Sequence, residues 1–291
     1  MSENNFSPAV PIHRDTADYS RPYSAEAERT HYNQMAPMAS IFSSIQGEGI
    51  YVGKPQLFIR FAGCNLRCDY CDTPEGLSLP KYCRVEKKAF ASASKQIANP
   101  ISASLLSKLI RASAKRFPCY HSIALTGGEP LLHAQFLKIF LPAARKTKIP
   151  IFLETNGTMP ENLEQIIELV DIISMDIKIP RDVGTKETDI WTSSEEFLKL
   201  ALKKGIHNQR IYLKVVVTGS GHVEDYRKTA LLINKFGRDI PIVLQPVSII
   251  NKSAKIKTAS FKKMTDIYKI FAGMHNNVRI IPQVHRLMNW K

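Results

Sequence analysis

The sequence has no apolar run approaching the roughly 18 residues that a membrane-spanning helix needs. It also has no apolar segment of the kind found in a secretory signal near its first residue. Cysteine is scarce, with five in 291 residues, and an odd number without a secretory signal argues against a disulfide framework. We therefore expect a cytoplasmic protein with no membrane partner.

A dense basic run is missing as well, although 40 Lys and Arg face 26 Asp and Glu and give a net charge of +14. Pairs such as Lys87 and Lys88, or Lys203 and Lys204, are spread along the chain without interleaved aromatic residues. A strongly basic chain can carry a nucleic-acid interface, but this scattered pattern favours an ordinary solvated surface and no nucleic-acid partner. Such a surface would equally attract an acidic electron donor such as flavodoxin.

Three of the five cysteines, Cys64, Cys68 and Cys71, are close together, with three and then two residues between them. Thiolates are the usual ligands of iron–sulfur clusters, and a tight loop lets three of them converge on one cubic cluster. Structural zinc is the less favoured alternative, because it usually needs four ligands and Cys83 and Cys119 stand alone. Three thiolates leave one iron of the cluster open to a small molecule. The loop therefore predicts a reactive cluster rather than a structural metal site.

Strand-like and helix-like segments alternate through most of the chain. The expected strands are 40–45, 57–61, 123–125, 151–153, 172–173, 211–217, 242–244 and 278–281, and the expected helices are 105–110, 136–144, 163–170, 223–236 and 259–273. A further helix is expected to begin at Ser193, which forms a capping-box pattern with Glu196. Apolar strands alternating with helices predict an α/β fold with an open parallel sheet covered by helices. About six such units are too few for an eight-stranded barrel.

The two remaining segments lack a clear period. Residues 1–37 are rich in Ser, Pro, Asn and Ala, and we expect an extension that is disordered or loosely packed. Residues 77–100 read as an insertion within a core domain that spans residues 38–291.

Polar motifs follow the expected strands one after another. Since ligands bind at the carboxyl ends of parallel strands, these motifs are expected to meet at one edge of the sheet. They are 63–73, 126–130, 154–157, 174–178, Lys214 and 245–246.

The cysteine loop resembles the CxxxCxxC signature of the radical SAM superfamily. Around it, the chain is similar to the 7-carboxy-7-deazaguanine synthase family from about Ser40 onward, in the order Gln46-Gly47-Glu48-Gly49, Arg60-Phe61-Ala62-Gly63, Asp72-Thr73, Thr126-Gly127-Gly128-Glu129-Pro130 and Gln283-Val284-His285. The resemblance implies a partial (β/α)6 barrel that forms a homodimer. It also implies a [4Fe–4S] cluster, S-adenosylmethionine and Mg²⁺, with 6-carboxy-5,6,7,8-tetrahydropterin contracted to 7-carboxy-7-deazaguanine as ammonia is lost.

The resemblance also implies a role for particular residues. Cys64, Cys68 and Cys71 would hold the cluster and Thr73 the magnesium ion. The substrate would contact Ile45, Gln46, Gly47, Glu48, Arg60, Thr126, His285 and Lys291. S-adenosylmethionine would contact Gly128, Glu129, Glu154, Asn156, Ser174, Asp176, Lys178 and Gln245, although Asp176-Ile177-Lys178 departs from the family's commoner Ser-Pro-Lys.

Two other functions stay open from the sequence. A different radical SAM enzyme, such as a glycyl-radical activase, would share the cysteine loop but has no reason to carry Gln46-Gly47-Glu48-Gly49 or Thr73. A non-catalytic nucleic-acid-binding iron–sulfur protein would account for the charge and for the insertion.

Overall fold

The computed structural model describes residues 33–183, 187–205, 210–248 and 256–289. Most of the expected extension, residues 1–32, and the expected substrate contact Lys291 lie outside the described residues. Among the helices of the described chain, none has the length and apolar character needed to cross a membrane.

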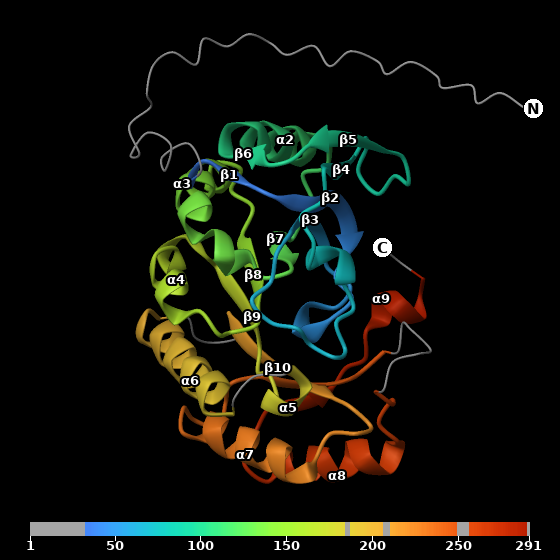
Figure 1. Ribbon diagram of the computed structural model, residues 1–291, viewed down its shortest axis with the longest axis vertical. Helices are drawn as coiled ribbons and strands as arrows, with labels where there is room; N and C mark the ends of the chain where they lie inside the picture. Colours follow the sequence, from blue (N-terminus) through green and yellow to red (C-terminus); the bar gives the residue numbers. More distant parts are fainter. Residues whose placement is uncertain (1–32, 184–186, 206–209, 249–255, 290–291) are drawn as a thin grey trace, which may run out of the picture.

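One ten-stranded sheet runs through the molecule. Its strand order is β12-β11-β10-β9-β8-β7-β3-β2-β4-β5, and Figure 1 shows it as the central layer. Seven strands are parallel: β3 (Pro55–Phe61), β7 (Ser122–Gly127), β8 (Ile151–Thr155), β9 (Ile172–Asp176), β10 (Ile211–Val217), β11 (Ile242–Pro246) and the short β12 (Val278–Ile280). β2 (Met38–Ile45) joins them antiparallel to β3. The expected open, mostly parallel α/β sheet is confirmed.

Helices alternate with the parallel strands and cover the sheet (Figure 1). In chain order they are α2 (Ala103–Arg116), α3 (Ala134–Arg145), α4 (Pro160–Glu164), α5 (Pro180–Val183), α6 (Glu187–Lys203), α7 (Val223–Asn234), α8 (Phe261–Ala272) and α9 (Val284–Leu287). The 3-10 helix Pro130–His133 precedes α3.

The core explains why these segments fold as they do. Strands β7 to β11 are almost wholly buried, as expected for parallel strands covered on both faces. On the helix side they pack with α2, α3, α6, α7 and α8 in one continuous cluster. On the other side, Phe58, Phe152 and Tyr212 form a second cluster, against which Phe42 and Tyr51 pack. This aromatic cluster fills part of the concave side of the sheet.

The insertion has a regular structure that the sequence analysis missed. It forms a hairpin of β4 (Tyr82–Glu86) and β5 (Ser94–Ala98), and β4 pairs with β2 to extend the sheet. Tyr82 and Arg84 are exposed while Cys83 and Val85 are buried, which is the alternation of a strand covered on one face. This alternation is only five residues long and is followed by small and charged residues, so the sequence analysis did not identify it as a strand.

Two expected boundaries are wrong. The packed core begins before residue 38, because β1 (Met35–Ala36) pairs with β6 (Ile101–Ser102) and Ala36 is fully buried. Ser193 is not a helix N-cap, because α6 begins six residues earlier. The buried residues Ile190, Ser194, Phe197 and Ala201 recur at helical spacing. The buried face of α6 therefore continues through Ser193, where the helix was expected to begin.

Candidate active site

A cavity of about 470 Å³ opens at the carboxyl ends of the parallel strands. Its lining includes residues in or directly after β3, β7, β8, β9, β10 and β11, together with the turn after β2 and the segment before α9. Most of the residues selected from the sequence line it: Ile45, Gln46, Gly47, Glu48, Arg60, Cys64, Cys68, Cys71, Thr73, Thr126, Gly128, Glu154, Asn156, Asp176, Lys178, Gln245 and His285. The fold therefore brings together segments that are far apart in the chain.

The loop that carries the three cysteines is fixed at its start by the Gly127-Gly128-Glu129 segment. Glu129 N donates a hydrogen bond of 2.8 Å to Gly63 O, and Gly128 N donates one of 3.1 Å to Phe61 O. A Cβ atom on Gly128 would lie 1.9 Å from Gly63 O. Only glycine permits this approach of two backbones. The two glycines of the motif therefore allow it to hold the start of the cysteine loop in position.

The cysteines suit a shared cluster. All three are free, half-buried and exposed to the same cavity. Burial raises the pKa of Cys64, with smaller contributions from Glu129 and Cys71. Burial and the two neighbouring thiols raise the pKa of Cys68 to about 11. Within the loop, Leu66 N donates a hydrogen bond of 3.4 Å to Cys64 Sγ. Three adjacent thiols and a cavity on one side fit a cluster with one open iron.

Glu129 does not line the cavity and is fully buried. Its carboxylate accepts hydrogen bonds from Asn156 N at 2.7 Å, Thr155 Oγ1 at 2.9 Å and Leu131 N at 3.0 Å. Burial raises the pKa of Glu129 to about 7, although these hydrogen bonds lower it. In this structure Glu129 orders the turn after β8 that presents Asn156.

Four charged groups form a chain across one wall of the cavity. Lys214 Nζ lies 2.6 Å from Glu48 Oε2 and 3.2 Å from Asp176 Oδ1, and Lys178 Nζ lies 2.8 Å from Asp176 Oδ2. Burial opposes ionisation of Glu48, yet Lys214 lowers its pKa to about 2. Burial would lower the pKa of Lys214, but Asp176 and Glu48 raise it well above its ordinary value. All four groups are therefore charged at neutral pH.

A second polar group lies beside this chain. Glu154 accepts hydrogen bonds of 2.7 Å from Gln46 Nε2 and from Thr126 Oγ1, one on each oxygen. Burial raises the pKa of Glu154, against the opposing charge of Lys214. Gln46 also positions the next turn, because its Oε1 accepts a 3.0 Å hydrogen bond from Glu48 N.

The segment around α9 closes the cavity from the other side. Gln283 Nε2 donates to Glu48 Oε1 at 2.8 Å and to Asp72 Oδ2 at 2.7 Å. Val284 N donates to Gly47 O at 2.9 Å, and a Cβ atom on Gly47 would lie 2.3 Å from His285 Nδ1. Glycine at position 47 is thus what lets His285 approach the turn after β2.

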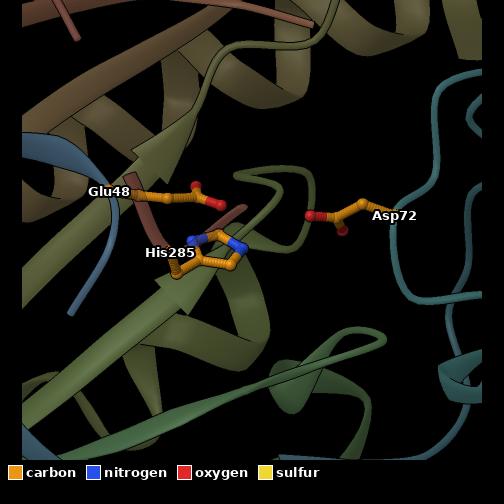
Figure 2. Close-up of side chains that lie close together, drawn as sticks. All are labelled: Glu48, Asp72 and His285. Atoms are coloured by element: carbon orange, nitrogen blue, oxygen red, sulfur yellow. The ribbon is translucent and has the colours of Figure 1, made fainter. Parts of the chain in front are cut away.

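Three side chains in this region form a group with metal-binding character. Glu48, Asp72 and His285 each offer one ligand atom, and these atoms lie within 4.8 Å of one another. Figure 2 shows the Asp72 carboxylate directed toward Glu48 and His285 from the opposite wall. Thr73 directly follows Asp72 and lines the same cavity, so oxygen ligands for a hard cation are available here.

Besides Glu129, one other described residue selected from the sequence lies away from the cavity. Ser174 is fully buried in the middle of β9 and does not line the cavity. It lies on the same face of the strand as Ile172, which packs in the aromatic cluster. Cys83 is buried and Cys119 is exposed, and neither lines the cavity.

Sequence reasoning did not assign a role to several residues that the fold brings into the site. They are Tyr70, Asp72, Lys214, Gln283 and Arg286, all of which line the cavity. Tyr70 lies between two cluster cysteines, and Lys178 Nζ lies 5.4 Å from its ring centroid. Lys214 had a signal in the sequence, since a lysine within an otherwise apolar strand needs a buried partner.

Comparison with known proteins identifies the class. Residues 58–233 match the family model described as the Radical SAM superfamily. QueE from Escherichia coli has the same fold, with a TM-score of 0.54 at 20% identity, covering 90% of this chain and 100% of that one. The chain is therefore a radical SAM protein.

Closer relatives narrow this class. The 7-carboxy-7-deazaguanine synthase of Geobacter sulfurreducens is 39% identical over 87% of this chain and 97% of its own length. The enzyme of the same name from Methanothermobacter thermautotrophicus is 35% identical over the same shares of the two chains. The chain belongs to the 7-carboxy-7-deazaguanine synthase family, as the sequence motifs predicted.

Proposed function

We propose that this chain converts 6-carboxy-5,6,7,8-tetrahydropterin to 7-carboxy-7-deazaguanine with loss of ammonia, as a radical SAM carbon–nitrogen lyase in queuosine biosynthesis. The observation that carries the proposal is the single cavity that joins Cys64, Cys68 and Cys71 to the polar wall of Gln46, Glu48 and Glu154. A cluster alone would suit many radical SAM enzymes, whereas this wall is built for a small polar heterocycle.

The cluster and S-adenosylmethionine, when bound, supply a 5′-deoxyadenosyl radical for hydrogen abstraction. The three cysteines would hold the cluster. Asn156, Asp176, Lys178 and Gln245 lie in or after β8, β9 and β11 and line the same cavity, so they are the groups proposed to bind the polar parts of S-adenosylmethionine. Gly128 lines the same cavity and is proposed to contact S-adenosylmethionine through its backbone. Glu129 is proposed to orient Asn156, to whose backbone it is hydrogen-bonded. Ser174, which is buried behind the cavity wall, is proposed to support that wall and not to contact the cofactor.

The substrate is proposed to bind between the turn after β2 and His285. Glu48 and Glu154 are carboxylate acceptors suited to the amino and N–H groups of a pterin ring. Gln46, Gly47 and Thr126 supply further polar groups on the same wall. Arg60 stacks on Phe42, with 5.4 Å between its guanidinium carbon and the ring centroid, and a guanidinium in a defined plane suits a substrate carboxylate. Ile45 supplies an apolar contact at the edge of this subsite.

We propose that Mg²⁺ binds with Thr73 as a ligand and orients the substrate carboxylate. The adjoining group of Glu48, Asp72 and His285 supports this proposal, because its carboxylates place negative charge beside Thr73. Mg²⁺ prefers oxygen ligands and keeps several waters. Replacing Thr73 with valine should therefore raise the magnesium concentration needed for half-maximal activity. An unchanged magnesium requirement in T73V would remove Thr73 from the site.

We also propose that the protein forms a homodimer, lies in the cytoplasm and receives its electron from a flavodoxin-type donor. The net charge of +14 supports an acidic donor, since long-range attraction raises association rates and is screened by salt. Light scattering of the purified protein tests the dimer. A reduction rate by flavodoxin that does not change with ionic strength would contradict charge-steered association.

One assay tests the reaction. Reconstituted protein is incubated without oxygen with a reductant, S-adenosylmethionine, Mg²⁺ and the carboxytetrahydropterin, and both 5′-deoxyadenosine and the deazaguanine are measured. Formation of both products supports the proposed reaction. Cleavage of S-adenosylmethionine without deazaguanine would indicate another radical SAM enzyme, such as a glycyl-radical activase. No cleavage would favour a non-catalytic iron–sulfur protein.

A further inference from the structure

The positive charge of the chain is concentrated in one segment, residues 77–153. This segment contains thirteen Lys and Arg and only two acidic residues, Glu86 and Glu129, against 27 and 24 in the rest of the chain. All thirteen cations are exposed, whereas Glu86 is 8% exposed and Glu129 0%. Most of the net charge of +14 therefore belongs to a surface to which this segment contributes no exposed carboxylate.

The fold gathers these cations at one end of the molecule. The segment forms the β4–β5 hairpin, α2 and α3, and the hairpin and α2 lie together at the top of Figure 1. Arg116 Nη1 at the end of α2 donates a 2.6 Å hydrogen bond to Lys87 O in the hairpin, and Phe90 packs edge-on against Phe117 at 5.1 Å. α2 also packs against α3. We call this surface the basic end: Lys81, Arg84, Lys87, Lys88, Lys95, Lys108, Arg111, Lys115, Arg116, Lys138, Lys146 and Lys148.

The cations of the basic end have no carboxylate partners within the described part of the chain. Of the thirteen in the segment, only Arg145 forms an ion pair there, with Asp171 at 3.0 Å, and we leave it out of the basic end for that reason. Elsewhere exposed lysines pair with acids, as Lys235 does with Glu195 and Lys204 with Glu168. Twelve unpaired like charges repel one another, and a polyanionic partner would relieve that repulsion.

We propose that the basic end binds nucleic acid through its phosphate backbone. Lys108, Arg111 and Lys115 follow one another at helical spacing and lie on the same side of α2. They span about 10 Å along the helix axis, which is about the axial rise of three successive phosphates on one strand of a duplex. Most hydrogen bonds between proteins and DNA go to phosphate and sugar, so contacts to phosphates are expected to dominate.

Two other anionic partners suit this surface less well. A membrane surface is bound by apolar side chains flanked by cations, but the exposed side of α2 carries Ser104, Lys108, Arg111, Ala112, Lys115 and Arg116. An acidic electron donor has to approach the cluster. The cluster loop packs through Leu66 against Val183 in α5 and Ile190 in α6, which lie away from α2 in Figure 1.

This inference reverses the expectation drawn from the sequence. The basic residues looked scattered because the hairpin, α2 and α3 are separate segments of the chain. Folding places the three segments beside one another, while the exposed acidic residues of the protein remain on other elements.

The test measures binding of a labelled RNA hairpin and a labelled DNA duplex to the whole protein by fluorescence anisotropy over a range of salt concentrations. The variant carries Lys108→Gln, Arg111→Gln and Lys115→Gln. The matched control carries Lys199→Gln, Lys203→Gln and Lys269→Gln, which remove the same charge from exposed positions on α6 and α8. Thermal unfolding and deazaguanine formation are measured for both, because neither set touches the cavity.

We expect the α2 variant to bind at least about tenfold more weakly at moderate salt, with a salt slope smaller by about 3, since each lost phosphate contact removes about 0.9. The control should bind within about twofold of the parent protein, and both variants should retain activity. Equal weakening in the two variants would show a general charge effect and overturn the proposal. So would the absence of binding at low salt, or tighter α2-dependent binding to phosphatidylserine vesicles or to polyglutamate than to either nucleic acid.

Discussion

Glu48 and Gln283 are joined by a hydrogen bond of 2.8 Å, although 235 positions separate them in the chain. The same Gln283 nitrogen donates at 2.7 Å to Asp72, directly after the last cluster cysteine. An amide nitrogen has two hydrogens, so one neutral side chain connects two carboxylates. Gln283 is 5% exposed, which places this connection inside the site and links the turn after β2 to the cysteine loop.

Replacing Gln283 with methionine keeps its volume and removes both donors. A hydrogen bond to a charged group contributes about 1.5 kcal/mol or more, so kcat/KM for the pterin should fall at least tenfold, mainly through KM. Gln283→Glu should lose more, because it brings a third carboxylate to Glu48 and Asp72. Steady-state kinetics measures both, with the exposed Gln135→Met as control. A Q283E enzyme with unchanged KM would contradict this role for Gln283.

Replacing Cys68 with alanine should remove the visible absorption of the reconstituted cluster together with turnover, because two thiolates cannot hold a cubic cluster at three irons. Cys119→Ala is the matched control, since Cys119 is exposed and lies outside the cavity. Iron content, visible spectra and deazaguanine formation are compared for the two variants. Turnover in C68A equal to that of the parent would refute the assignment of the cluster.

Replacing Lys214 with methionine leaves Glu48 and Asp176 without the cation they share. Lys214 is 6% exposed, and removing one member of a buried ion pair costs about 3 to 5 kcal/mol. The free energy of unfolding, measured with denaturant, should fall by about that amount. Lys204→Met, which breaks the exposed pair with Glu168, should cost under about 1 kcal/mol.

Adding Glu48→Gln to Lys214→Met should restore part of the lost stability, because it removes one of the two unpaired carboxylates. A double variant that is as unstable as the sum of the two single variants would show that Glu48 and Lys214 do not interact in solution.

Glu129 predicts a pH dependence of stability. Burial raises its pKa to about 7 in the folded protein, whereas the ordinary value is 4.5. Between these values the folded chain binds one proton more than the unfolded chain, so this contribution to stability is present below about pH 4.5 and is lost as the pH rises through 7. The shift corresponds to about 3 kcal/mol.

Denaturant unfolding of the protein without cluster, at several pH values from about 4.5 to 8, measures this effect. Glu129→Gln should flatten the profile, whereas the exposed Glu161→Gln should follow the parent protein. Superimposable profiles for E129Q and the parent would mean that Glu129 does not titrate in this range.

Local signals in the sequence predicted the sheet and the cluster loop. The apolar strands β7 to β11 are short buried runs bounded by turns, which need no knowledge of the rest of the fold. The three cysteines lie within eight residues, so their spacing alone indicated shared ligation. The rule that ligands bind at the carboxyl ends of parallel strands then predicted that the polar motifs meet, and most of the residues selected from them line one cavity.

The partners of charged residues could not be predicted in the same way. Lys214 faces Glu48 only because β10 and the turn after β2 approach each other across the concave side of the sheet. Glu129 looked like a ligand-binding residue, but its three hydrogen bonds to 131, 155 and 156 depend on how two loops pack. Such contacts follow from the tertiary structure and leave no period in the sequence.

The connection between Glu48 and Gln283 has a consequence for how the enzyme matures on the ribosome. The cluster cysteines are synthesised about two hundred residues before Gln283, so all three thiols are present on a nascent chain before the proposed pterin subsite can be completed. A chain released early by a nonsense codon downstream of β11 would carry its thiols while lacking the side chain that fixes Glu48 against Asp72. Pterin binding is therefore expected to require Gln283, whereas the three cluster thiols are complete without it.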